Sequence, residues 1–338
     1  MANSRKLPCL DLLQARWGAC AKDHILPRQR LVVGLSGGLD SVALLYWLSQ
    51  NVAGEQHRIS AVHVHHGLSS NADDWASHCQ ALCAALEVPL VVAKVSVEQA
   101  SKDGLEGAAR RARHAAFART DGDWIVLAHH RGDQAETVLF NLLRGSGVRG
   151  AAAMRQRNGR LLRPWLHVGR DVIEDYARQA GLRWIEDESN ADVRFSRNFL
   201  RHRVLPSMRE RFPAAEERLA AAAGQFAAAQ QLLDDLARID LAGAPATFPL
   251  SVSALSNLSD ARAANVLAYM LRTCGVAVPS KERLIEAVRQ FSTAEPDRHP
   301  SVRFGEYHLL RRRGEIELAG PPSEGSRVID NNESGEFP

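Results

Sequence analysis

The most informative segment of this 338-residue chain is Leu31-Val32-Val33-Gly34-Leu35-Ser36-Gly37-Gly38-Leu39-Asp40-Ser41. Its apolar first half is typical of a short buried strand, and its polar second half predicts a turn into a helix. Glycine lets the backbone approach a ligand closely, and a helix N-terminus offers free N–H groups and a positive dipole end. Ser36–Ser41 therefore predicts a cradle for phosphate, in which Asp40 needs Mg²⁺ or another cation between its carboxylate and the phosphate.

Further strand-like and helix-like segments alternate after this one. The strand-like segments are 58–65, 90–95 and 124–128, and the helix-like segments are 40–48, 71–86, 105–119 and 133–143. Strands that alternate with helices of this length predict an α/β fold with a doubly wound parallel sheet, covered by helices on both faces. Such a sheet binds ligands at the carboxyl ends of its strands. The residues that directly follow each strand are therefore the candidate site residues.

The alternation ends near Gly145, and the composition changes after Pro213, where a long alanine-rich helical segment begins. We expect a catalytic domain over residues 1–213 and a mainly helical second domain over 214–320. In the second domain, helices are predicted at 258–273 and 281–291, followed by a strand pair between 302 and 318. Residues 321–338 are polar and acidic and predict a disordered tail.

Composition excludes several classes of protein. The chain is 45% hydrophobic and 24% charged, as in soluble globular proteins, and no apolar run approaches the ~18 residues that a membrane span needs. The N-terminus lacks the apolar stretch of a secretory signal. Five scattered cysteines argue against a disulfide framework and for a reducing compartment, so we expect a cytoplasmic protein with no membrane partner.

The basic residues are unevenly distributed. Only five of the 42 are lysines, and residues 144–165 contain six arginines and no acid. A second basic cluster lies between Arg194 and Arg211, opposed only by Glu210. Acid-free basic stretches favour a phosphate-rich partner such as nucleic acid over solvated surface arginines.

The phosphate loop and six later motifs together resemble one family. The later motifs are His63–Leu68, Glu106–His114, Ala128–Thr137, Leu142–Gly147, Glu186–Asn190 and Phe195–His202, with Arg163-Pro164 as a shorter match. In this order and spacing, over residues 30–210, they resemble the tRNA(Ile)-lysidine synthetases, which are N-type ATP pyrophosphatases with a Rossmann-like PP-loop domain. Three positions depart from the family pattern: His65 replaces Asn, His114 replaces Tyr, and Gly132 replaces the first Asp of an Asp-Asp pair.

The resemblance implies an ATP-dependent carbon–nitrogen ligase. Such enzymes use ATP to adenylate C2 of the wobble cytidine of tRNA(Ile) with a CAU anticodon, and lysine then displaces AMP. The product reads AUA instead of AUG. The implied ligands are therefore ATP, Mg²⁺, L-lysine and this tRNA.

The resemblance also implies roles for individual residues. Asp133 and Glu136, three apart at the start of a helix, are implied as the lysine-binding pair and as catalytic groups. Arg110 and Arg113 are both candidates for neutralising charge on the α-phosphate, with no choice between them. The ATP-binding residues are implied to be Ser36, Gly37, Gly38, Leu39, Asp40, Ser41, His63 and His129, with Asp40 as the Mg²⁺ ligand.

His129 and His130 follow the fourth predicted strand at the ligand edge of the sheet; they contact the nucleotide in one interpretation and cap the sheet in the other. Gly132 stands where the family pattern has an aspartate. If that aspartate binds metal in the family, Mg²⁺ binding in this chain depends more on Asp40. Residues expected to contact the tRNA are Arg144, Arg149, Arg155, Arg157, Arg163, Arg197, Asn198, Arg201 and His202.

Three alternatives remain beside the ligase. A tRNA thiolase with paired cysteines needs a C-x-x-C, and a glutamine-dependent amidotransferase needs a glutaminase; neither is visible in the sequence. A non-catalytic nucleotide-binding regulator is disfavoured by the intact phosphate loop and acid pair. The β-rich C-terminal domain of larger family members is not recognisable here, and the oligomeric state stays open, with a homodimer among the options.

Overall fold

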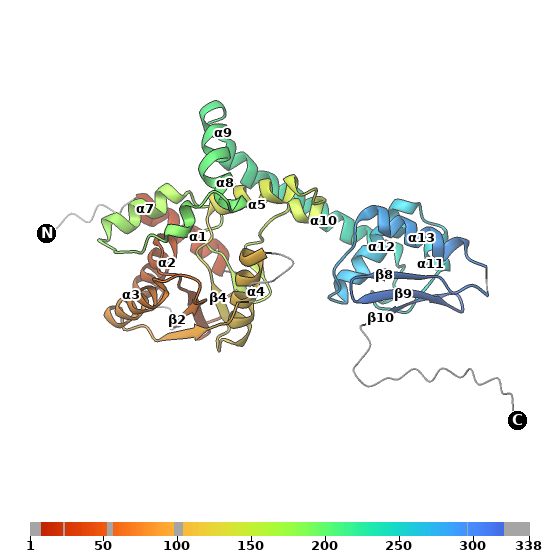
Figure 1. Ribbon diagram of the computed structural model, residues 1–338, viewed down its shortest axis with the longest axis horizontal. Helices are drawn as coiled ribbons and strands as arrows, with labels where there is room; N and C mark the ends of the chain where they lie inside the picture. The colour runs from red at the N-terminus through yellow and green to blue at the C-terminus, as the bar shows by residue number, and fades with distance from the viewer. Residues whose placement is uncertain (1–7, 23, 53–56, 98–103, 296, 321–338) are drawn as a thin grey trace, which may run out of the picture. The chain divides into compact units, whose positions relative to one another are not determined.

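The computed structural model describes residues 8–22, 24–52, 57–97, 104–295 and 297–320. The predicted tail lies outside these residues. The chain divides into two compact units, Met1–Ala227 and Ala228–Pro338 (Figure 1).

The first unit is built on a six-stranded sheet in the order β3-β2-β1-β4-β6-β5. The strands are β1 (Arg30–Gly34), β2 (Arg58–His65), β3 (Leu90–Lys94), β4 (Trp124–Val126), β5 (Arg157–Asn158) and β6 (Leu161–Leu162). All neighbours pair in parallel except β5, which runs antiparallel to β6. The predicted parallel α/β sheet is confirmed, and the short hairpin of β5 and β6 extends it from within the basic segment.

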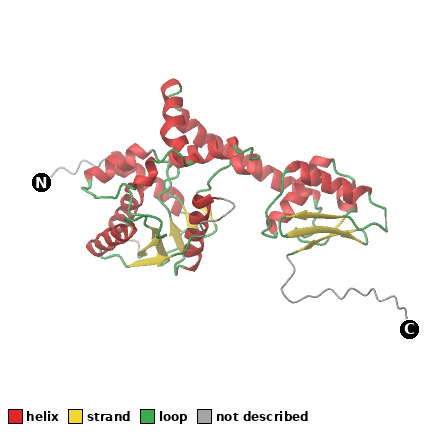
Figure 2. Ribbon diagram, in the orientation of Figure 1, coloured by secondary structure: helices red, strands yellow, loops and turns green. Residues whose placement is uncertain are grey.

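Helices cover both faces of this sheet (Figure 2). They are α1 (Pro8–Ala21), α2 (Leu39–Asn51), α3 (Ala72–Ala85), α4 (Gly104–Arg119), α5 (Arg131–Leu143) and α7 (Arg170–Gln179). Alternate β1 side chains enter different cores, as the pleat requires: Leu31 and Val33 pack in the cluster that contains Trp17, Trp47 and Trp165, on the side of α1 and α2.

Val32 enters the opposite cluster with Phe117 of α4. Because both faces of β1 are buried, the strand reads as a continuous apolar run instead of an alternating one. Cys79 and Cys83 on α3 are buried in the first cluster, as expected of small apolar side chains.

Short helical segments complete the first unit. They are α6 (Val148–Ala151), the 3₁₀ turn η2 (Glu188–Ala191), α8 (Ser196–Phe199), the π-helical turn η3 (Leu200–Val204) and α9 (Leu205–Arg211). The π turn ends at Val204, and Leu205 separates it from Pro206, which has no N–H to donate. The Leu205 N–H bonds the carbonyl of Leu200, five residues earlier.

The second unit combines helices with a four-stranded antiparallel sheet in the order β7-β10-β9-β8. Its elements are the C-terminal part of α10 (Ala215–Asp240), β7 (Leu250–Ser251), α11 (Ser253–Ser256), α12 (Asp260–Thr273), α13 (Lys281–Thr293), β8 (Ser301–Phe304), β9 (Tyr307–Arg312) and β10 (Glu315–Ala319). The prediction of a mainly helical domain omitted two of these strands.

The sequence placed the boundary at residues 213 and 214, whereas the compact units divide inside α10. The reason is that the first turn of α10 contacts the rest of the first unit: Glu216 lies 3.7 Å from Arg131 at the start of α5. Within the described residues, no helix is long and apolar enough to cross a membrane.

Candidate active site

The strand order places a topological switch point between β1 and β4. From β1 the chain winds outward through β2 to β3, and it then returns to add β4 on the other side of β1. The loops after β1 and β4 therefore leave the carboxyl edge of the sheet side by side, which is where open α/β sheets bind ligands. α2 and α5 begin at this edge.

The phosphate loop is held by its own serines. The Ser41 hydroxyl accepts a hydrogen bond from Ser36 N–H at 3.1 Å and donates to the Gly38 carbonyl at 3.0 Å. The two hydroxyl oxygens of Ser36 and Ser41 lie 3.0 Å apart. The serines thus shape the loop, and the first N–H groups of α2, which have no partner within the helix, are the donors available to phosphate.

Gly37 is required by both its backbone and its surroundings. Its φ is +88°, and a Cβ there would lie 2.8 Å from Ile185 Cδ1 and 3.2 Å from Cys79 Sγ. Ile185 N–H also donates to the Gly37 carbonyl at 2.9 Å. A side chain at this position would therefore displace the loop.

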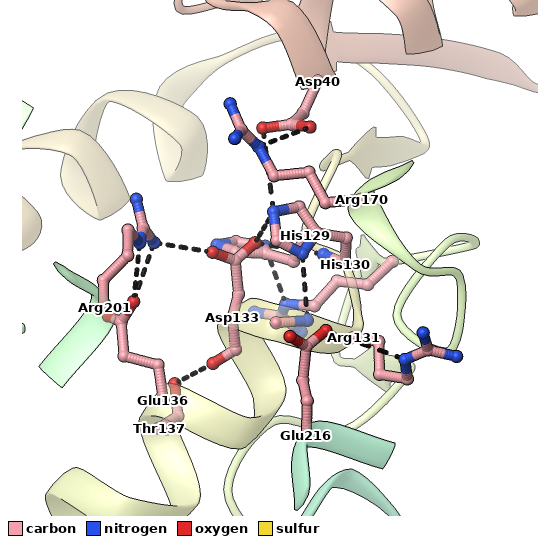
Figure 3. Close-up of polar contacts among 12 residues, drawn as sticks. Asp40, His129, His130, Arg131, Asp133, Glu136, Thr137, Arg170, Arg201 and Glu216 are labelled. Carbon is pink, nitrogen blue, oxygen red and sulfur yellow. Dashed lines mark hydrogen bonds and ion pairs between the residues drawn. The ribbon is translucent and has the colours of Figure 1, made fainter. Parts of the chain in front are cut away.

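Asp40 lies in the first turn of α2 and faces the start of α5 (Figure 3). Its Oδ2 is 3.8 Å from His130 Nε2 and its Oδ1 is 4.0 Å from Arg170 Nε. Burial raises the pKa of Asp40, which His130 partly offsets, and Oδ1 is buried without a hydrogen-bond partner. An orphaned carboxylate oxygen beside a phosphate cradle fits Mg²⁺.

The described residues contain no group of three or more His, Cys, Asp or Glu side chains that could hold a metal alone. Mg²⁺ is commonly held by one or two carboxylates together with substrate phosphates, and Asp40 matches that arrangement.

His130 caps the N-terminus of α5. The ring atom Nδ1 of His130 accepts a hydrogen bond from Gly132 N–H at 3.0 Å, and the backbone N–H of His130 donates to Asp133 Oδ2 at 3.0 Å. Because Nδ1 acts as an acceptor, the neutral ring carries its proton on Nε2. That atom lies 3.8 Å from Asp40 Oδ2 and 3.6 Å from Asp133 Oδ2, so His130 links the two carboxylates.

Asp133 and Glu136 lie on one face of α5, as predicted, and Arg201 contacts both of them (Figure 3). Arg201 Nη2 is 2.9 Å from Asp133 Oδ1 and 2.8 Å from Glu136 Oε2, and Arg201 Nε donates to Glu136 Oε2 at 2.9 Å. Arg197 Nη1 approaches Glu136 Oε1 and Thr137 Oγ1, both at 3.4 Å. The pair is thus part of a cluster with both signs of charge.

The two acids differ electrostatically. Burial raises the pKa of Glu136, and the adjacent Arg201 offsets this only in part. Burial also opposes ionisation of Asp133, but His130, His129 and Arg201 outweigh it and lower the pKa of Asp133. Asp133 is therefore the more acidic of the two carboxyl groups, and Glu136 is the more basic.

His129 lies behind this cluster. Burial, together with the charges of Arg163, Arg113 and Arg110, lowers the pKa of His129 to about 3 despite an opposing effect of Asp133. Arg163 Nε donates to His129 Nδ1 at 3.3 Å, so the neutral ring carries its proton on Nε2. Arg110 and Arg113 of α4 thus lie close enough for their charges to act on His129, and their role at the α-phosphate stays a prediction.

His63 lies beneath the phosphate loop. Its Nδ1 is 2.9 Å from the Leu35 carbonyl and 3.5 Å from Cys79 Sγ, and burial lowers its pKa. The buried ring supports the end of β1 from below.

Sequence comparisons match two family models to the chain. A PP-loop domain covers residues 12–208, and a TilS substrate binding domain covers residues 250–316. Relatives named tRNA(Ile)-lysidine synthase are 49% identical over 270 residues in Aromatoleum aromaticum and 37% identical over 325 residues in Nitrosomonas europaea. These alignments cover 79% and 94% of this chain.

The chain belongs to the tRNA(Ile)-lysidine synthase family.

It spans 63% of the length of the Aromatoleum lysidine synthase and 71% of the Nitrosomonas one. Among solved structures, the fold is similar to a U34-tRNA thiolase from Methanococcus maripaludis that carries a [4Fe-4S] cluster, with a TM-score of 0.55 at 13% identity over 64% of this chain and 79% of that one. This likeness concerns the fold alone.

The residues expected to contact tRNA in this family member differ in exposure and in their contacts. The exposed ones are Arg144, Arg149, Arg155, Arg157, Arg201 and His202. Arg201 nevertheless contacts the acid pair, as does the partly buried Arg197. Arg163 is only 4% exposed and also donates to the Arg155 carbonyl at 2.9 Å, so its guanidinium is not presented to a nucleic acid. Asn198 donates to the Asp192 carbonyl at 3.0 Å.

The sequence analysis of this chain did not identify three residues that lie at the candidate site. Arg170 faces Asp40, Ile185 covers Gly37, and Glu216 contacts the start of α5. None stands in a position that a local pattern marks, although Ile185 directly precedes the motif Glu186–Asn190, which could have directed attention to it.

Proposed function

We propose that this chain is a ligase that attaches lysine to C2 of the wobble cytidine of tRNA(Ile) with a CAU anticodon. The observation that carries the proposal is the contiguity of the two half-sites: His130 Nε2 lies 3.8 Å from Asp40 at the phosphate loop and 3.6 Å from Asp133 of the acid pair. A nucleotide and an amino acid bound to these groups would be neighbours, as a reaction that passes through an adenylate requires.

In the first step, the cytidine C2 oxygen attacks the α-phosphorus of ATP, and the bond to the bridging oxygen of pyrophosphate breaks. The N-terminus of α2 binds the phosphates. Asp40 would hold Mg²⁺, which would neutralise charge at the phosphates when bound. Arg110 and Arg113, whose charge reaches His129, stabilise negative charge that develops at the α-phosphate.

In the second step, the lysine ε-ammonium loses a proton to solvent, the neutral amine attacks C2, and the bond from C2 to the phosphate-bearing oxygen breaks so that AMP leaves. The ε-amine must be neutral to attack, so the charged groups of the protein suit the other end of lysine. Asp133 and Glu136 bind the α-ammonium, and Arg201 pairs with the α-carboxylate. The Arg201 side chain is 42% exposed, which leaves an edge of its guanidinium accessible to the substrate.

The exposed arginines bind the tRNA backbone. Phosphate contacts position an RNA without reading its sequence, and their number sets the salt dependence of binding. We further infer that the reaction takes place in the cytoplasm, where tRNA and ATP are available.

The direct test incubates the protein with ATP, Mg²⁺, radiolabelled lysine and a tRNA(Ile) transcript that carries the CAU anticodon. Label in the tRNA that disappears when the wobble cytidine is replaced supports the ligase. Pyrophosphate release that depends on tRNA, without label, rejects lysine as the nucleophile. A folded protein that gives neither signal contradicts the proposal.

A further inference from the structure

Gly132 stands in the first turn of α5 where the family pattern has an acid, and the structure contains another acid next to it. A Cβ at position 132 would point at Glu216, whose Oε1 lies 3.4 Å from that point. The same Cβ would lie 2.9 Å from His130 Cε1 and 3.1 Å from His130 Nδ1. The absent side chain thus leaves room for the His130 ring and for a carboxylate from a helix 84 residues further along the chain.

Glu216 connects three elements at this point. Its Oε1 is 3.7 Å from Arg131 Nε in the first turn of α5, and its Oε2 is 3.7 Å from Arg209 Nη1 of α9. Its side chain is 17% exposed. A carboxylate near the N-terminus of α5 also interacts favourably with the positive end of the helix dipole.

Arg131 extends the connection to the start of α7. Its N–H donates to the Val168 carbonyl at 2.8 Å, and its Nη2 lies 2.8 Å from where a Cβ on Gly169 would be. The next residue, Arg170, places its Nε 4.0 Å from Asp40 Oδ1. A displacement of Arg131 therefore reaches both His130, through the first turn of α5, and Arg170, through the turn before α7.

We propose that Glu216 is a positioning residue for the active site, and that its carboxylate takes the place of the acid missing at Gly132. Glu216 touches none of the reacting groups. It acts by fixing Arg131, so that the starts of α5 and α7 present His130 and Arg170 to Asp40. The effect of Glu216 on kcat rests on the proposed function. The spatial relationship between positions 132 and 216 does not depend on that function.

The test is a double-mutant cycle of Glu216→Ala, Gly132→Asp and the double variant, with Glu216→Gln to remove only the charge. Glu216→Gln is expected to lower kcat for tRNA-dependent pyrophosphate release by roughly tenfold to a hundredfold, the scale for a small misplacement of reacting groups, with little change in the KM for lysine. Gly132→Asp alone should lower kcat as well, because the new side chain meets both Glu216 and His130. Glu216→Ala removes the contact of the new carboxylate with position 216 but not its contact with His130, so the double variant should recover part of the activity and lose clearly less than the product of the two single losses.

Glu217→Gln, at the exposed neighbouring position of α10, is the matched control and should leave kcat unchanged. Thermal unfolding of every variant identifies those that fail to fold, and kcat is compared at a temperature where all are folded. The proposal is overturned if folded Glu216→Gln has the kcat of wild type. It is also overturned if the kcat of the double variant falls by the product of the factors lost in the two single variants.

For the same set of variants, we also measure the Kd of a non-hydrolysable ATP analogue with Mg²⁺. This measurement does not depend on a reaction with lysine. We expect weaker binding in each single variant and partial recovery in the double variant, with a loss smaller than the product of the two single losses. A wild-type protein that binds the analogue without ligating lysine contradicts the proposed function, whereas additive losses in Kd contradict the role of Glu216.

Discussion

Arg201 Nη2 lies 2.9 Å from Asp133 Oδ1, although 68 residues separate the two in sequence. The contact turns an acid pair into a site with both signs of charge, which matches the ammonium and carboxylate of an amino acid. It also gives Arg201 a place inside the site, where its sequence context had indicated the RNA surface.

The first prediction concerns this mixed-charge site. Arg201→Gln should raise the KM for lysine by roughly tenfold or more, because a hydrogen bond between charged groups contributes about 1.5–3 kcal/mol, while the KM for ATP changes little. Cadaverine, which is lysine without its carboxylate, should be a much poorer substrate than lysine for the wild-type protein. In Arg201→Gln this preference for lysine over cadaverine should be lost. An unchanged preference for lysine over cadaverine in Arg201→Gln would show that the guanidinium does not bind the carboxylate; Arg203→Gln, at an exposed position, serves as the control.

The second prediction concerns Asp40. Asp40→Asn keeps the size of the side chain but removes the charge that fits Mg²⁺, so tRNA-dependent pyrophosphate release should fall by about 100-fold or more. The Kd of an ATP analogue should lose its dependence on Mg²⁺ while metal-free binding persists. Asp74→Asn on the exposed side of α3 should behave as wild type, and retained Mg²⁺ dependence in Asp40→Asn would exclude Asp40 as the ligand.

The third prediction is a pH dependence of stability. Because the pKa of His129 is about 3 in the folded protein and about 6.5 in the unfolded chain, only the unfolded state takes up this proton as the pH falls below 6.5. Its contribution to stability is therefore present above pH 6.5 and is lost on acidification toward pH 3, by up to about 2 kcal/mol at pH 5.

His129→Asn retains an acceptor for Arg163 but does not titrate, so its free energy of unfolding should fall less between pH 7 and pH 5 than that of wild type. Urea denaturation at the two pH values measures the difference. Equal losses in both proteins would mean that His129 is protonated in the folded state.

The fourth prediction concerns the exposed arginines. Replacing Arg155 and Arg157 by Ala should weaken tRNA binding and reduce the slope of log K against log salt by roughly 0.7–0.9 for each lost phosphate contact. Filter binding at several salt concentrations measures the slope. Arg178→Ala, which removes the partner of Glu174 on α7, is a surface control, and an unchanged slope in the double variant would place the RNA elsewhere.

Features carried by local patterns could be predicted from the sequence. The apolar run at Leu31–Leu35 indicated a buried parallel strand because both of its faces are covered, and the glycines and serines that follow it indicated a helix start. Asp133 and Glu136 were placed on one helix face by their spacing alone.

Partnerships across long separations could not be predicted in this way. The burial of Arg163 and the contact of Arg201 with the acid pair depend on how distant segments pack, and an arginine has the same local signal whether it faces solvent or another side chain. The position of Glu216 beside Gly132 likewise follows from where α10 begins in space. His129 and His130, left open by the sequence, separate into a buried neighbour of Arg163 and an N-cap.

The charges around Glu136 also bear on the order in which the protein folds. Glu136 is 2% exposed, yet its cationic partners Arg197 and Arg201 follow it by 61 and 65 residues. A chain that emerges from the ribosome completes α5 well before these arginines exist, and a carboxylate without a partner is costly to bury. The first turns of α5 should therefore stay hydrated until the segment 196–204 docks, which makes that docking a late event in folding and the active site one of the last regions to exclude water.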